Sequence, residues 1–198
     1  MNATNESANP QKSVYPLSAR EATERLRIPA AVLILLLIGL HAERWGFESI
    51  IDILRRPLPI VSLLAAYFGG LIAHELLHTL GYTTIGGAPF RSCPISFNGL
   101  LITSHCELPI PVWRYRVATA LPGVILGLVP LTAGLISGKA WLSVYGAIMT
   151  GGALGDARVL WALRRVPANS AVTYRPAIEA YEAEPILQPA VPAADSSE

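Results

Sequence analysis

Apolar residues in this chain are gathered into long blocks, and this feature most limits how it can fold. The blocks at 58–82 and 117–138 are each long enough to cross about 30 Å of hydrocarbon as a helix, which takes roughly 20 residues. A segment in contact with lipid must satisfy its own backbone hydrogen bonds, so it is helical unless it closes into a barrel. The pattern therefore predicts an all-α membrane protein.

Blocks of this kind predict about four transmembrane helices, at 28–47, 58–82, 117–138 and 140–163. The first is the weakest of them, because only 28–40 is purely apolar. It fits either a full crossing that ends near Trp45 and Phe47 or a half-inserted helix, and we favour the full crossing. The composition agrees with a membrane protein, since 52% of the residues are hydrophobic and only 15% are charged.

Lysine and arginine lie mainly on one side of the predicted membrane. They occur in the N-terminal arm, in the loop between the second and third spans, and directly after the fourth span, whereas the other side has Arg44, Arg55, Arg56 and Lys139. Because basic loops stay in the cytoplasm, both termini and this central loop are predicted to be cytoplasmic, in a cell membrane. The net charge of +1 provides no basic surface for nucleic acid.

Both ends of the chain are predicted to be disordered. The arm 1–27 is polar and the tail 167–198 is rich in Pro and Ala, so neither has enough apolar surface to offset the entropy of ordering. The membrane domain is then 28–166. In the central loop, Phe97-Asn98-Gly99 lies between apolar runs and favours a small β-hairpin, although an irregular cytoplasmic loop fits equally well.

Residues 74–78 read His-Glu-Leu-Leu-His, inside the second block. On a helix, His74 and His78 lie one turn apart on one face, close enough to hold one ion. Zinc binds imidazole nitrogen at about 2.0–2.1 Å, and a catalytic site keeps one position open for water. Glu75, beside that position, is the predicted catalytic residue and would take a proton from the water as general base. The alternative is a buried polar network that joins helices.

Asp156 is the acid that can complete such a metal site. Counted from the expected helix starts, His74 and Asp156 both lie 16 residues into spans that run in the same direction, and so at one depth. A carboxylate in hydrocarbon costs several kcal/mol and persists there for function or pairing. We therefore predict His74, His78 and Asp156 as zinc ligands; the alternative is an ion pair of Asp156 with Arg158 or a hydrogen bond from Asp156 to another helix.

Four further residues fit less specific roles. Cys93 and Cys106 lack the paired spacing of a structural zinc site and are expected to be reduced thiols, with a single disulfide as the alternative. His105 could donate a hydrogen bond to an oxyanion, as Asn98 could, but a solvated loop side chain is the simpler interpretation of each.

Two other features concern the helices themselves. Gly151, Gly152 and Gly155 are small enough to let neighbouring helices approach the fourth span closely. His41 is expected to be an interfacial side chain, on the far side of the membrane from the motif.

This constellation resembles two groups of membrane zincins: the intramembrane site-2 proteases and, more closely, a family of small four-span zincin peptidases. The resemblance covers about 60–165 and rests on the motif at 74–78, on the loop that leads through His105-Cys106 to Leu121-Pro122-Gly123, and on Gly155-Asp156. In site-2 proteases a glycine typically follows the aspartate, whereas Ala157 follows it here.

The resemblance implies a zinc-dependent membrane metallopeptidase that hydrolyses a peptide bond at or near the cytoplasmic membrane boundary. By that similarity His74, His78 and Asp156 would ligate zinc, Glu75 would be the general base, and the substrate would be a protein or peptide, membrane-bound in some cases. Two alternatives stay open: a membrane protein that binds metal for transport or structure without peptidase activity, and a hydrolase of a lipid-like amphiphile.

Overall fold

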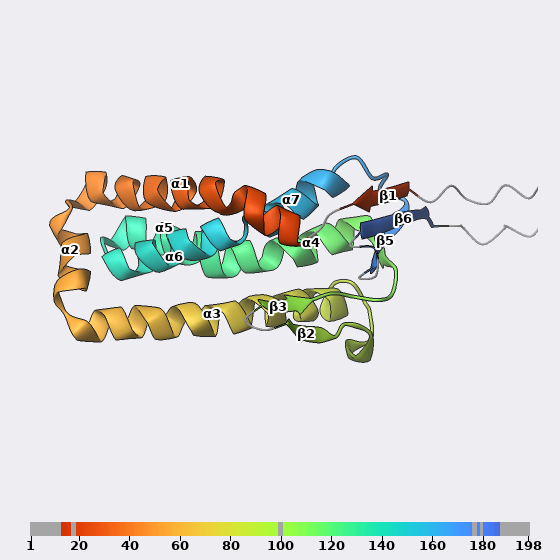
Figure 1. The fold of residues 1–198 in the computed structure, drawn as a ribbon, viewed down its shortest axis with the longest axis horizontal. Coiled ribbons are helices and arrows are strands. Elements are labelled where there is room, and N and C mark those ends of the chain that lie inside the picture. Colours follow the sequence, from red (N-terminus) through yellow and green to blue (C-terminus); the bar gives the residue numbers. More distant parts are fainter. Residues whose placement is uncertain (1–12, 17–18, 99–100, 176–177, 179, 187–198) are drawn as a thin grey trace, which may run out of the picture.

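The computed structural model describes residues 13–16, 19–98, 101–175, 178 and 180–186. The long helical segments lie side by side and run parallel to the long axis of the molecule (Figure 1). They are α1 (Ala19–Trp45), α2 (Glu48–Arg55), α3 (Pro57–Thr84), α4 (Val112–Pro122), the π-helical η2 (Gly123–Leu128), α5 (Val129–Ser137), α6 (Ala140–Gly152) and α7 (Leu154–Leu163). The chain thus passes along the axis as α1, α3, α4–η2–α5 and α6–α7, with the short α2 joining α1 to α3 (Figure 1).

Three helical segments are long and apolar enough to cross a membrane: Arg25–Trp45, Pro57–Thr84 and Val112–Ser137. Little of each is covered by the rest of the protein, since only 6%, 6% and 28% of their most apolar windows are buried. An apolar helix in a soluble core would be largely buried, so these surfaces suit lipid.

The fourth predicted span is two shorter helices rather than one long helix. The chain leaves helical geometry at Ala153, where φ is −76° and ψ is 4°, and α7 begins at the next residue. Gly151 and Gly152 directly precede this break, and glycine is a poor helix former. Four helices of membrane-crossing length were predicted, and the described residues contain three.

The third span begins earlier than predicted, at Val112, and is locally widened. Pro122 and Pro130 both lie inside the continuous helix, and the π-helical segment Gly123–Leu128 falls between them. A proline has no backbone N–H to donate to the carbonyl four residues earlier, so each one frees an acceptor inside the helix. The carbonyl freed by Pro122 belongs to Ala118, which matters for the site described below.

A small antiparallel sheet covers one end of the helices, so the fold is not purely α-helical. The predicted disorder is wrong for the strands within the arm and the tail, whereas 1–12 and 187–198 lie outside the described residues. The strand order of the sheet is β1-β6-β5-β4, formed by β1 (Ser13–Pro16), β4 (Ile110–Pro111), β5 (Ser170–Arg175) and β6 (Ala180–Pro185). Composition suggested disorder in the arm and the tail. Each strand is too short to alter the overall composition of its segment. When β5 and β6 pair, however, they bury Val172 and Ala183.

The enclosed core of the molecule lies at this same end. It joins the end of α3, the start of α4, the end of α7 and the sheet, through Tyr82, Tyr115, Leu163, Val172 and their neighbours. The described part of the chain is thus held by lateral helix contacts along its length and by a compact core at one end.

A second, two-stranded sheet lies in the central loop, where a hairpin was predicted. Strand β2 (Ile95–Asn98) pairs antiparallel with β3 (Leu101–Ser104), and Ile95 is opposite Ser104. The 3-10 turn η1 (Phe90–Ser92) precedes the hairpin. Strand β3 contacts α3, so the hairpin lies beside the helix that carries the motif (Figure 1).

Candidate metal centre

The two histidines of the motif lie on neighbouring turns of α3, as the helical spacing predicts. Their ring centroids are 4.9 Å apart and their planes are inclined by 81°. No glycine or proline interrupts α3 between Gly70 and Gly81, so the motif lies in a regular stretch of helix. His78 is almost fully buried, with 4% of its surface exposed, and His74 is half-buried.

Asp156, in the first turn of α7, faces both histidines. Its Oδ2 lies 3.1 Å from Nε2 of His74, and its Oδ1 lies 3.2 Å from Nε2 of His78. The three ligand atoms all lie within 4.8 Å of one another. The structure therefore brings together the three residues expected to bind metal, although Asp156 lies 78 positions after His78 in the sequence.

The donor set fits zinc. A tetrahedral ion with bonds of about 2.0–2.1 Å holds its ligand atoms roughly 3.3 Å apart, close to the spacing between each imidazole and the carboxylate. Among the described residues, Oδ2 of Asp156 is buried without a properly oriented hydrogen bond, although Nε2 of His74 lies so near. Imidazole and carboxylate donor atoms that converge at this range are the arrangement a shared cation requires, although the same contacts also fit hydrogen bonds from the two imidazoles to the carboxylate. Two imidazoles and one carboxylate also leave one tetrahedral position open.

Residues 67–171, more than half of the chain, match a protein family described as "Putative zincin peptidase". The chain belongs to this family. No curated protein and no solved structure matches it. The family implies zinc, and the matched region includes the motif on α3 as well as Asp156 on α7.

Glu75 is next to this zincin centre but is not one of the three convergent ligands. It lines a cavity of about 430 Å³ together with His74. The rest of the lining is mostly apolar and comes from α1, α3, β3 and α6: Ala30, Ile34, Tyr67, Leu71, Ile102, Ile148, Met149, Gly151 and Gly152. A carboxylate at the wall of a cavity that also reaches a ligand histidine has room for both water and substrate beside it.

The β2–β3 hairpin is attached to the motif helix by a polar contact. Oγ of Ser104, at the end of β3, lies 2.7 Å from Oγ1 of Thr79 on α3. The backbone N–H of Ser104 also lies within reach of the Glu75 carboxylate. The hairpin therefore forms one wall of the zincin site.

Aromatic and backbone groups contact the His78 ring. The ring of Tyr82 stacks on that of His78 with centroids 6.0 Å apart, and its hydroxyl donates to the hydroxyl of Tyr115 at 3.3 Å. The Ala118 carbonyl, freed by Pro122, lies close to the His78 ring, but Nδ1 of His78 makes no hydrogen bond of normal geometry among the described residues. Partners of this kind orient a metal-ligating imidazole.

Sequence reasoning missed this support. His74, His78 and Tyr82 follow one another at intervals of four residues, so the helical period already placed Tyr82 on the motif face. Its partner Tyr115 and the Ala118 carbonyl come from another helix, and no local pattern identifies them.

The glycines of the fourth span differ in their surroundings. A Cβ on Gly151 would meet Cγ1 of Ile34 at 2.5 Å, so α1 approaches α6 closely there, as predicted. The prediction was wrong for Gly152 and Gly155, because a Cβ on either would meet nothing within 4 Å. No ion pair joins Asp156 to Arg158, both of which the structure describes.

Two other sequence candidates lie near the hairpin. The ring of His105 packs edge-on against Tyr174, with centroids 5.7 Å apart, and does not join the metal ligands. Asn98 ends strand β2, and its side chain lies outside the described part of the structure.

The two cysteines flank the hairpin as free, buried thiols with their sulfur atoms 2.7 Å apart. Burial, together with the neighbouring Cys106 thiol, raises the pKa of Cys93 to about 12. Cys93 is therefore protonated at neutral pH, which makes it a poor metal ligand.

His41 is buried within the protein, whereas an exposed interfacial side chain was expected. It is fully enclosed, and its Nδ1 shares a 2.8 Å hydrogen bond with Oγ of Ser143 on α6. It lies toward the α2 end of α1, remote from the motif, as expected.

Proposed function

We propose that this chain is a zinc-dependent integral-membrane metallopeptidase with Glu75 as general base. The observation that carries the proposal is the convergence of His74, His78 and Asp156, with Glu75 on the wall of the adjoining cavity. When bound, zinc would lower the pKa of a ligand water toward about 7 and polarise a substrate carbonyl.

The residues of the chain have separate tasks in this proposal. His74, His78 and Asp156 would hold the ion, and three protein ligands are the number typical of a catalytic zinc site. Glu75 accepts a proton from the attacking water and delivers it to the nitrogen of the leaving amine. Tyr82 and the Ala118 carbonyl keep the His78 ring in the orientation that ligation needs.

The proposed membrane arrangement has four crossings, with α6 and α7 together making the last. Strands β1 and β6, which lead to the two termini, lie at the same end of the molecule as the hairpin beside the motif (Figure 1). With the lysine and arginine distribution, this supports cytoplasmic termini in a cell membrane and peptide-bond hydrolysis at or near the cytoplasmic boundary. The mostly apolar cavity beside Glu75 favours a protein or peptide substrate that presents an apolar residue next to the cleaved bond.

Replacement of the base tests the proposal. We expect Glu75→Gln to keep one zinc per chain but to lower hydrolysis by about 10²–10⁴-fold, because the amide cannot accept the proton. The measurement compares membrane peptides by mass spectrometry in cells that carry the wild type, Glu75→Gln or the control Glu43→Gln, an exposed acid on α1. Peptides that disappear only in Glu75→Gln support the base, whereas an unchanged profile with zinc retained would exclude it.

A lipid-like amphiphile is a second candidate substrate, favoured by the apolar cavity. The same two variants separate this candidate from the first when lipids and peptides are analysed from one membrane preparation. A difference confined to lipids would move the assignment from peptidase to amphiphile hydrolase. No difference in either class, with zinc still bound, would favour a metal site for transport or structure.

A further inference from the structure

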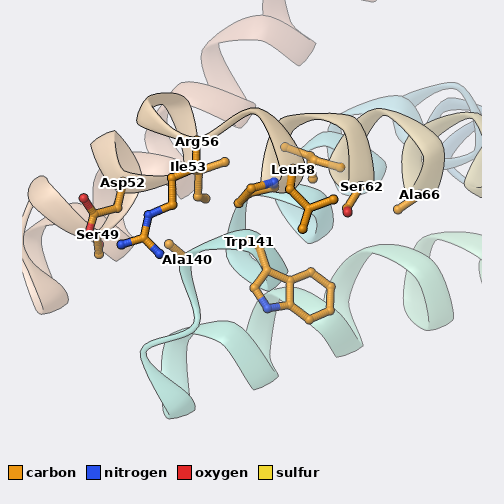
Figure 2. Close-up of a pocket in the computed structure, with 11 residues that line it drawn as sticks. Ser49, Asp52, Ile53, Arg56, Leu58, Ser62, Ala66, Ala140 and Trp141 are labelled. Carbon is orange, nitrogen blue, oxygen red and sulfur yellow. The ribbon is translucent and has the colours of Figure 1, made fainter.

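A second cavity lies at the opposite end of the helices from the zincin site. It has a volume of about 510 Å³ and is enclosed by α2, the first turns of α3 and the start of α6 (Figure 2). Its lining is Ser49, Asp52, Ile53, Arg56, Leu58, Pro59, Ser62, Leu63, Ala66, Ala140 and Trp141. None of these residues belongs to the metal centre or to the cavity beside Glu75.

The polar and apolar parts of this cavity are separated in space. Ser49, Asp52 and the Arg56 guanidinium lie together at one side, and Leu58 and Ala66 follow along α3 on the other, with the Trp141 ring below them (Figure 2). Since α3 runs from this edge into its apolar span, the cavity changes from charged to apolar toward the middle of the proposed membrane. This is the polarity gradient of an amphiphile aligned with membrane lipid.

The cationic side chain that remains available is Arg56. The neighbouring Arg55 bonds Glu48 at 3.1 Å and lies 3.6 Å from Asp52, so it already neutralises acid on α2. Arg56 points into the cavity and makes no ion pair with any residue that the structure describes (Figure 2). A guanidinium in this state is suited to a phosphate, which it can bind through two parallel hydrogen bonds.

The apolar side chains that line the cavity are exposed, so they are available to contact an apolar ligand. Leu58 is 74% exposed and Trp141 is 49% exposed, although both line the cavity. Tryptophan at a membrane boundary commonly packs against lipid at the level of the headgroups. Helix α2 is also amphipathic, with Ile53 buried and Asp52 exposed, as expected of a short helix lying along that boundary.

We propose that this cavity is a phospholipid site, in which Arg56 binds the phosphate and an acyl chain lies along α3 between Leu58 and Ala66, against Trp141. The proposal rests on the membrane location in the proposed function, but not on zinc or hydrolysis. A water-soluble phosphate ester would leave the apolar half uncovered, and a lipid without phosphate would leave Arg56 without a partner.

Native mass spectrometry of the full chain in mild detergent tests the phosphate half. The titrants are dioleoylphosphatidylglycerol, dioleoylglycerol with the same chains but no phosphate, and free glycerol phosphate. We expect saturable binding of the phospholipid only, weakened about tenfold or more by Arg56→Ala, since a hydrogen bond to a charged group contributes about 1.5–3 kcal/mol. The control Arg44→Ala should change the dissociation constant less than about twofold, because that exposed arginine lies in the last turn of α1 and outside the lining.

A second pair of variants tests the acyl half. Ala66→Trp should fill the cavity and reduce phospholipid binding, whereas Ala65→Trp, one position along the same exposed helix and outside the lining, should not. Equal phospholipid affinity in the wild type and Arg56→Ala, equal binding of dioleoylglycerol, or equal effects of the two tryptophans would each overturn the site. Zinc content, measured on the same samples, reports separately on the metal centre.

Discussion

Two buried histidines at opposite ends of this bundle have different partners. His78 faces the carboxylate of Asp156, with a second imidazole on the next turn of its helix. His41 is enclosed as completely, but its Nδ1 has only the Ser143 hydroxyl. One ring nitrogen of each histidine, Nε2 of His41 and Nδ1 of His78, has no hydrogen-bond partner among the described residues. Both are polar side chains on apolar helices, yet only the first belongs to a set of three convergent ligands.

The difference shows what distinguishes a candidate metal site from a helix-to-helix hydrogen bond. A hydroxyl satisfies one nitrogen of a neutral imidazole and adds no charge, so it joins α1 to α6 without attracting a cation. A carboxylate and two imidazoles provide three donor atoms and one negative charge, which together can offset part of the dehydration of a divalent ion. Burial of a histidine is therefore uninformative until its partners are known.

The largest expected effect is on zinc binding, and it tests this distinction directly. His78→Ala should weaken zinc by more than about 100-fold, since even the loss of an outer partner typically costs 10–100-fold. His41→Ala, which removes an equally buried histidine, should leave the stoichiometry and affinity of zinc unchanged. Competition with a chelator, followed by elemental analysis in detergent, measures both. If the two variants lose zinc alike, the metal lies elsewhere.

The second prediction concerns the close packing around the motif end of α3. A Cβ on Gly81 would meet Cβ and Cα of Ala118 on α4 at 2.8 and 2.9 Å, whereas one on Gly69 would meet nothing within 4 Å. Gly81→Ala should therefore lower the free energy of unfolding by about 1–3 kcal/mol through overpacking. Gly69→Ala should raise it by up to about 1 kcal/mol through helix propensity. Thermal unfolding of both variants in one detergent measures the change. Shifts of the unfolding temperature with the same sign in both would contradict the close approach of α3 to α4 at Gly81.

Pro122 gives a third test, because it frees the Ala118 carbonyl that lies close to the His78 ring. Pro122→Ala restores a backbone donor for that carbonyl within the helix, so we expect about a tenfold loss of zinc affinity, as for other outer partners. Pro130→Ala alters the same continuous helix after the π-helical segment and should leave affinity unchanged. Chelator competition at fixed pH measures the dissociation constant. Equal zinc affinities in the two variants would show that the Ala118 carbonyl does not contribute to zinc binding.

The features predicted from the sequence are those that depend on local periodicity. Apolar blocks placed the long helices, the turn signal placed the hairpin, and helical spacing put His74 and His78 on one face. The equal depth expected for His74 and Asp156 then placed Asp156 beside the histidines, even though the predicted fourth span is two helices that meet just before it.

The features that were missed depend on contacts between distant segments. Strand β1 exists as the partner of β6, more than 160 residues away, and their composition resembles that of disordered chain. The packing of Tyr82 on His78 and the burial of His41 against Ser143 likewise follow from which helices become neighbours. Neither contact can be recognised from the sequence of a single helix.

The smallest expected effect is at the far histidine. Ser143→Ala removes the hydroxyl that partners His41, and we expect it to lower the free energy of unfolding by about 1 kcal/mol, the usual net contribution of a buried hydrogen bond. Ser137→Ala is the matched control, because the Ser137 hydroxyl bonds the Ala133 carbonyl of its own helix and is exposed. Neither variant should change zinc affinity. A loss of zinc in Ser143→Ala would mean that the two histidine sites are coupled through α6, since that helix leads directly to α7 and Asp156.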